Sequence, residues 1–328
     1  MTTSSARLFR VSVGAALLGA LAVPAQAFTA YVSNEKSNTV TVIDTAKFEA
    51  VKTIKVGQRP RGIEVTRDGK FVLVAVGDDD TIEMIDTTTK EVTATLPSGP
   101  DPELFTQDPS GKLLYVANEN DNMVTVIDLE RRVKVGDVPV GVEPEGLGLS
   151  PDGKVLVNTS ETTNMAHFID TATSRIVANV LVDSRPRFAE FKHDGSELWV
   201  SAEVGGTVSI IDPVHHQVTG KISFEIPGLR KEAIQPVGIA LTRDGKTGFV
   251  ALGPANRIAV VDGASHEVKK YLLVGQRVWH MAFTPDEKYL FTTNGVSNDI
   301  SVIDVGALKV IKTIAVGELP WGIAMSPQ

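Results

Sequence analysis

The residues of this chain that could do chemistry gather in seven short loops of similar sequence. The loops read RPRG (59–62), DPEL (101–104), EPEG (143–146), RPRF (185–188), QPVG (235–238), RVWH (277–280) and LPWG (319–322). Most of them carry a charged residue on each side of a proline. Guanidinium groups in such loops can bind an anion, and a carboxylate or the imidazole of His280 can accept a proton.

Basic and acidic residues occur in different loops. The acidic residues fall in two consecutive loops as Asp101, Glu103, Glu143 and Glu145. The basic residues are Arg59, Arg61, Arg185, Arg187 and Arg277. This pattern predicts charge that is segregated around a ring. Its cationic part would suit carboxylates, because a planar guanidinium binds them through two N–H groups. In the alternative, the arginines pair with the acids across the ring and hold it together.

Aromatic residues in the last two loops complete the candidate site. Trp279 and Trp321 could stack on a flat ligand, and His280 is the one histidine of the ring. His280 either serves as an axial ligand or base, or packs beside Trp279. The candidate ligand-binding residues are Arg59, Arg61, Glu103, Glu145, Arg185, Arg187, Arg277, Trp279, His280 and Trp321.

We assign no catalytic residue and no metal ligand. The sequence has no H-x-x-x-H, H-E-x-x-H or G-x-S-x-G motif, no P-loop and no dinucleotide fingerprint. It also lacks the loop pattern of calcium-binding helix pairs. We expect His167 in the core and the acidic turns NENDN (118–122) and GDDD (77–80) in solvent. Four further histidines are expected in solvated turns: His193, His215, His216 and His266.

An internal repeat must position these loops. An aspartate ends one apolar run in each unit, and successive aspartates are 42 residues apart except for one spacing of 50: Asp44, Asp86, Asp128, Asp170, Asp212, Asp262 and Asp304. Turn sequences such as RDG and PDG, and the prolines of the ring loops, recur with the same period. Periods of about 40 residues are typical of solenoids and propellers.

Each unit contains four short runs rich in β-branched residues. In the first unit they are YVSN, TVTVID, KTIKV and GIEVT, separated by the turn-forming segments NEKSN, DTAKFEA, GQRP and RDGK. Four short strands in about 40 residues are the pattern of one propeller blade. Seven units therefore predict an all-β, seven-bladed β-propeller with four-stranded blades.

The ends of the repeat region predict how the ring closes. The chain enters the first unit at a second strand, AYVSN, and ends in a first strand, GIAMSP. We expect this C-terminal strand to complete the N-terminal blade. The blade geometry places the seven ring loops, and the loops between second and third strands, on one face, called the top face below. The long spacing predicts an insertion at about 224–235, FEIPGLRKEAIQ, which could form a short helix over the channel mouth.

Residues 1–27 have the features of a secretory signal peptide. Arg7 and Arg10 precede an apolar stretch that is too short to span a bilayer, and AQA follows as a cleavage site. The mature domain would be residues 28–328, exported by the general secretory route to the periplasm and soluble there. The net charge of −8 becomes −10 without the two arginines, which argues against nucleic acid and anionic membranes as partners. The absence of cysteine excludes disulfides and thiolate chemistry.

The units resemble the YVTN β-propeller repeat over residues 28–328, as in YVAN…VTVID…VGVEPEGLGLSPDGK. The segments DSRPRFAEFKHDGSELWVSAEVGGTVSIID and YLLVGQRVWHMAF look like periplasmic propellers associated with pyrroloquinoline quinone-dependent alcohol catabolism. This resemblance implies a non-enzymatic binding or scaffold role beside a quinoprotein dehydrogenase or a cytochrome c. Pyrroloquinoline quinone, a tricarboxylate, is then a candidate ligand. Two alternatives stay open, which are a propeller lactonase and a cofactor carrier similar to the propellers that bind haem d1.

Overall fold

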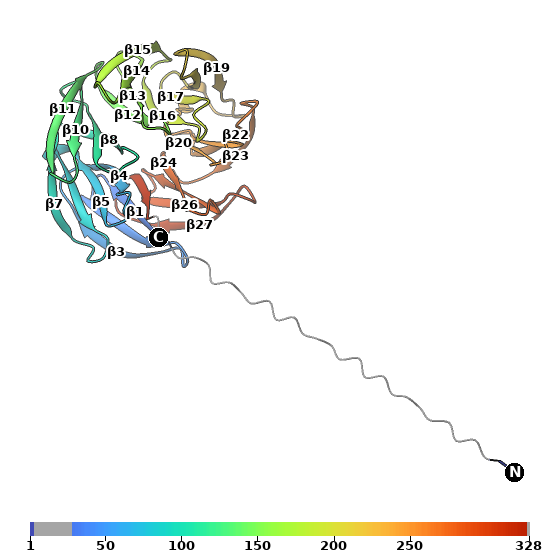
Figure 1. Cartoon of the computed structure of the whole chain (residues 1–328). Coiled ribbons are helices and arrows are strands. Elements are labelled where there is room, and N and C mark those ends of the chain that lie inside the picture. Colours follow the sequence, from blue (N-terminus) through green and yellow to red (C-terminus); the bar gives the residue numbers. More distant parts are fainter. Residues whose placement is uncertain (3–27, 327–328) are drawn as a thin grey trace.

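The computed structural model describes residues 1–2 and 28–326. In these residues, 28 strands form seven four-stranded antiparallel sheets arranged around a central axis (Figure 1). The predicted seven-bladed β-propeller is confirmed. No helix in the described part of the chain is long and apolar enough to cross a membrane. The predicted signal peptide falls almost entirely in 3–27 and so lies outside the described residues.

Every blade places its strands in the same order, from the innermost to the outermost. The first four blades consist of β28 (Pro320–Met325), β1 (Thr29–Asn34), β2 (Thr39–Asp44) and β3 (Glu49–Lys55); β4 (Pro60–Val65), β5 (Phe71–Val76), β6 (Thr81–Asp86) and β7 (Val92–Pro97); β8 (Pro102–Gln107), β9 (Leu113–Asn118), β10 (Met123–Asp128) and β11 (Val133–Pro139); and β12 (Pro144–Leu149), β13 (Val155–Ser160), β14 (Met165–Asp170) and β15 (Arg175–Leu181). The other three consist of β16 (Pro186–Phe191), β17 (Leu198–Ala202), β18 (Thr207–Asp212) and β19 (Gln217–Ser223); β20 (Ile239–Leu241), β21 (Thr247–Ala251), β22 (Arg257–Asp262) and β23 (Val268–Leu273); and β24 (Val278–Phe283), β25 (Tyr289–Asn294), β26 (Asp299–Asp304) and β27 (Lys309–Ala315).

The C-terminal strand closes the ring as predicted. β28 pairs antiparallel with β1, with Tyr31 opposite Ala324 and Val32 opposite Ile323. The backbone N–H of Ser326 donates to the carbonyl of Thr29 at 2.8 Å. In Figure 1 the red C-terminal strands accordingly lie beside the blue N-terminal ones. Closure gives the first blade its fourth strand and pairs the edge of β1, which limits edge-to-edge aggregation.

Burial follows the position of a strand in its blade. The two middle strands are buried on both faces, because each blade packs between two neighbours. The outer strand is mostly exposed and buries one apolar side chain near its end in every blade. These seven residues have the same position in the repeat: Ile54, Leu96, Val138, Val180, Ile222, Leu272 and Ile314.

The repeated aspartates terminate the third strands. Oδ1 of Asp44 accepts the backbone N–H groups of Ala46 and Lys47 at 3.0 and 3.1 Å. Oδ1 of Asp86 accepts those of Thr88 and Thr89 at 2.8 Å. An aspartate that binds its own backbone two or three residues later stabilises a turn. The aspartate that marks the repeat is therefore a structural residue.

The insertion lies between β19 and β20. Its helical part is a single 3-10 turn, Lys231–Ala233, which is shorter than the predicted helix would need to be to cover the channel. Phe224, Ile226 and Ile234 are buried in the cluster between the fifth and sixth blades. The insertion is therefore anchored in the core on its way back to the top face. Its last residue, Gln235, accepts a hydrogen bond from Arg277 at 2.8 Å.

Candidate functional site

A recurrent side-chain contact holds the ring loops on the top face. Oδ1 of Asn38, in the loop between β1 and β2, accepts the backbone N–H of Arg59 at 3.1 Å. Asn164 does the same for Arg185 at 3.0 Å, and Asn256 does it for Arg277 at 2.8 Å. The three arginines have positive φ angles of 55 to 59°, a conformation that is costly for residues other than glycine. These hydrogen bonds hold the backbone in that conformation, and the backbone sets the position from which each arginine side chain extends.

The ring encloses a pocket of about 290 Å³, called the top-face pocket below. Six of the ten candidate residues line it, together with three acidic residues. The lining residues are Arg59, Arg61, Asp101, Glu119, Arg185, Arg187, Glu203, Arg277 and Trp279. Of the other four candidates, Glu103 and Glu145 are buried among the ion pairs below, and Trp321 and His280 lie deeper in the channel.

The first two ring arginines share one buried carboxylate. Oε1 of Glu103 is 3.1 Å from Nη1 of Arg59 and 2.8 Å from Nη1 of Arg61. Arg59 also contacts Asp101, and Nη2 of Arg61 is 3.0 Å from Glu35. Because Glu103 is fully buried, its two guanidinium partners offset the cost of removing its carboxyl group from water.

The other three arginines form a second network around Glu203. Arg187 is 6% exposed and contacts Glu145 at 2.9 Å, Glu161, and Glu203 at 3.8 Å. Arg185 contacts Glu161 at 2.8 Å, and Arg277 contacts Glu203 at 2.8 Å. Burial alone would lower the pKa of Arg187, but the surrounding carboxylates raise it above its ordinary value. The predicted pairing with the acids of the ring loops is therefore present for Arg59, Arg61 and Arg187, whereas Arg185 and Arg277 pair with other glutamates.

Four glutamates that the sequence analysis did not assign to the site lie in it. Glu35, Glu161 and Glu203 pair with the arginines, and Glu119 lines the pocket. Each directly follows the second strand of its blade, and three blades have glycine at the same position: Gly77, Gly253 and Gly295. The expected segregation of charge is therefore wrong, because the hairpin loops bring carboxylates among the arginines. The expectation that NENDN is a solvated turn is also wrong for Glu119, which reaches into the pocket.

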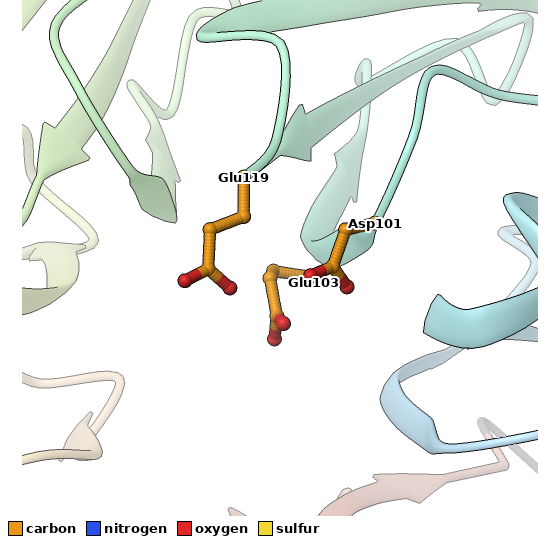
Figure 2. Close-up of side chains that lie close together, drawn as sticks. All are labelled: Asp101, Glu103 and Glu119. Atoms are coloured by element: carbon orange, nitrogen blue, oxygen red, sulfur yellow. The ribbon is translucent and has the colours of Figure 1, made fainter.

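Asp101, Glu103 and Glu119 form an acidic cluster at the edge of the pocket (Figure 2). One carboxylate oxygen from each lies within 4.8 Å of the other two, near enough to share a cation. Arg59 and Arg61 already bind Glu103 and would repel a metal ion at this point. Burial, and then the charge of Glu103, raise the pKa of Glu119 to about 7. These contacts favour a proton held by the cluster over a metal ion.

An aromatic layer of Phe188, His280 and Trp321 lies beneath the pocket. The imidazole of His280 is 4.3 Å from the Trp321 ring and 5.4 Å from the Phe188 ring, measured between centroids. The expected packing of His280 beside Trp279 is thus wrong, because Trp279 instead lies under Arg277, at 4.3 Å from its guanidinium carbon. Burial, and then the charges of Arg187 and Arg61, lower the pKa of His280 to about 3 and keep its ring neutral.

The comparisons with known proteins agree with this architecture. Residues 20–135 match the model of the family described as lactonase, 7-bladed beta-propeller, which is less than half of the 328 residues. No curated protein sequence matches the chain.

Two solved structures show the same fold. Kuenenia stuttgartiensis hydrazine synthase is 23% identical with a TM-score of 0.78, over 84% of this chain and 92% of that one. A functionally unknown protein from Desulfotomaculum acetoxidans DSM 771 is 17% identical with a TM-score of 0.77, over 90% and 98%. Because 1775 solved chains match, the fold by itself does not select a function.

The histidines outside the ring have structural contacts. His167 is buried as expected, with Nδ1 at 2.6 Å from Asn179 Oδ1. His193 and His215 are exposed as expected. The expectation of solvated side chains is wrong for the other two, because His216 packs on Phe168 and His266 contacts Glu197 at 3.0 Å.

Proposed function

We propose that the protein is an exported, non-enzymatic binding protein whose top-face pocket takes a small anionic ligand. The difference in exposure between the arginines and their acidic partners carries this proposal. The side chains of Arg185 and Arg277 are 49% and 25% exposed, whereas those of the carboxylates that they contact, Glu161 and Glu203, are 3% and 7% exposed. These two guanidinium groups are therefore accessible above the carboxylates that neutralise them.

The proposed ligand is a planar polycarboxylate, with pyrroloquinoline quinone as the first candidate. Several guanidinium groups can bind separate carboxylates, and Trp279 offers an indole near the guanidinium groups of Arg277 and Arg187. A pocket of about 290 Å³ is at the small end of the range for organic ligands. The sequence resemblance supports a periplasmic role beside a quinoprotein alcohol dehydrogenase or a cytochrome c, either of which would dock on this face.

Calorimetric titration with pyrroloquinoline quinone tests the ligand. The variants Arg185→Gln and Arg277→Gln are suitable because these side chains are 49% and 25% exposed. We expect each to weaken binding about tenfold or more, as for the loss of one charge-assisted hydrogen bond. Arg243→Gln, on the opposite face, is the matched control and should leave the affinity unchanged. Equal affinity in all four proteins would contradict the proposal.

A lactonase is the second candidate, because the family model that matches residues 20–135 is named for that activity. The residues available as a base are His280 and Glu145. Burial raises the pKa of Glu145, whereas His280 is held neutral and weakly basic behind Trp321. Hydrolysis across a panel of lactones, lost in Glu145→Gln or His280→Ala, would support this candidate. The absence of turnover by the wild-type protein would remove it.

A further inference from the structure

A second cavity lies below the aromatic layer and has no part in the top-face pocket. This central cavity has a volume of about 580 Å³ and is lined by the inner strands β4, β8, β12, β16, β24 and β28. Its other end reaches exposed residues of the turns on the opposite face, Arg67, Pro109, Pro151 and His193. A ligand could therefore enter from the face that carries the Asp-Gly turns.

Apolar and aromatic side chains form part of the wall of the central cavity, beside polar and charged groups. Phe105, Phe188 and Phe191 line it, with Leu147, Met281 and Ile323 between them. Small-molecule sites combine such a wall with a few convergent polar groups. The volume is within the range of such sites, about 300 to 1000 Å³.

Two carboxyl groups from different blades line this cavity. Glu64 on β4 and Glu190 on β16 occupy the same position of the repeat, where the other units have Thr106, Gly148, Ala240, Ala282 and Ala324. Glu64 accepts a hydrogen bond from Nε2 of Gln107 at 3.0 Å. Burial raises the pKa of Glu64 to about 7. For Glu190, burial and then the charge of Glu64 raise the pKa to about 8.

Glu190 has no polar partner. Among residues 28–326, no side chain or backbone group makes a hydrogen bond or an ion pair with its carboxyl. Glu190 is only partly exposed in the cavity wall, and a partly desolvated carboxylate without a protein partner favours any ligand that donates a hydrogen bond or carries a positive charge. Arg67, whose charge acts on Glu64, donates a hydrogen bond to the carbonyl of Gln107 at 3.2 Å.

We propose that the central cavity binds a small hydrophobic ammonium ion, with its nitrogen at Glu190 and Glu64 and its apolar body against the phenylalanines. Ammonium groups bind carboxylates and the faces of aromatic rings, so both features of the wall are used. Two carboxylates supply too few oxygen ligands for calcium, which takes six to eight. An anion would be repelled by the glutamates.

The charged and titratable groups that line the cavity predict how binding depends on pH. They are Glu64 and Arg67 from β4 and its turn, Glu190 and His193 from β16 and its turn, and His280 from β24. β8, β12 and β28 contribute neutral residues to the lining. The ligand needs an ionised Glu190, whose pKa is about 8 in the free protein. Binding should therefore strengthen as the pH rises from about 6 to 8.

Calorimetric titration of the mature protein with benzylammonium at about pH 8 tests the inference. We expect Glu190→Gln to weaken binding at least about tenfold and Glu64→Gln to weaken it less, because Glu190 has no other partner. Glutamine resembles the protonated carboxyl, so both variants should keep the fold, as circular dichroism can verify. Glu130→Gln, in an exposed turn, is the matched control.

Neutral and anionic analogues separate a charge-selective site from an apolar void. Benzyl alcohol should bind at least about tenfold more weakly than benzylammonium, and benzoate should not bind. The inference is overturned if benzyl alcohol and benzylammonium bind equally, if Glu190→Gln leaves the affinity unchanged, or if benzylammonium gives no heat and no rise in melting temperature. None of these results bears on anion binding in the top-face pocket, because Arg185 and Arg277 do not line the central cavity.

Discussion

Replacement of Arg187 by methionine is expected to lower the free energy of unfolding by about 3 to 5 kcal/mol. Arg187 is 6% exposed and contacts Glu145, Glu161 and Glu203, which are 1%, 4% and 5% exposed. Methionine fills much of the volume of the arginine side chain but carries no charge. The three carboxylates therefore lose a cationic partner that they share. An uncompensated buried charge costs more than the pair itself contributes.

Chemical denaturation at several pH values measures this effect. Without Arg187, the pKa values of Glu145 and Glu161, already raised by burial, rise further in the folded state. A raised carboxyl pKa means that the folded state takes up protons more readily than the unfolded state. The loss in free energy of unfolding is therefore largest at high pH, and it becomes smaller as the pH falls through the pKa of the folded state. Arg175→Met, on the exposed outer strand β15, is the control. A loss below about 1 kcal/mol at pH 8 would show that the network contributes little to stability.

The fold could be predicted from the sequence because residues of the same type make the same contacts at the same positions of every blade. Asp44 and Asp86 end third strands through the same backbone contacts, so the aspartate recurs wherever a blade recurs. Ile54 and Leu96 fill the same outer position between blades. These constraints act within one unit or between adjacent units, and they appear directly as a period of 42 residues.

The site was harder to predict because its contacts join loops from different positions of the repeat. Arg59, Arg61, Arg185 and Arg187 were found because a proline marks their loops. Their partners Glu35, Glu161 and Glu203 lie in hairpins that the sequence analysis did not assign to the site. Arg187 contacts Glu161 of the preceding blade, and Arg277 contacts Glu203, which lies two blades earlier in the ring. An alignment of the seven units would have shown that the position after the second strand is glutamate in four units and glycine in three.

The cavity carboxylates were missed for a related reason. Glu64 and Glu190 alternate with apolar residues within their strands, which is the ordinary pattern of a half-exposed strand. In a propeller, however, the inner strand faces the channel rather than bulk solvent. The same alternation therefore places these carboxyls in the central cavity, where burial raises their pKa values.

Deletion of Trp321–Gln328 is expected to lower the melting temperature by at least about 10 °C and to promote aggregation. The deletion removes nearly all of β28, including Trp321 and Ile323, which are 1% and 8% exposed. Loss of one buried tryptophan costs about 3 to 5 kcal/mol, a large part of a typical total of 5 to 15 kcal/mol. It also breaks the 2.6 Å hydrogen bond from Thr293 Oγ1 to the Trp321 carbonyl and leaves the edge of β1 unpaired.

Scanning calorimetry and light scattering of the truncated chain measure both effects. A variant that lacks only residues 327–328 is the control, because it retains β28, and its melting temperature should equal that of the full chain. The point variant Trp321→Ala separates packing from closure, since it keeps the β28–β1 pairing while removing the indole. If truncation at residue 320 left the melting curve unchanged, the pairing of β28 with β1 would not be what holds the first and last blades together.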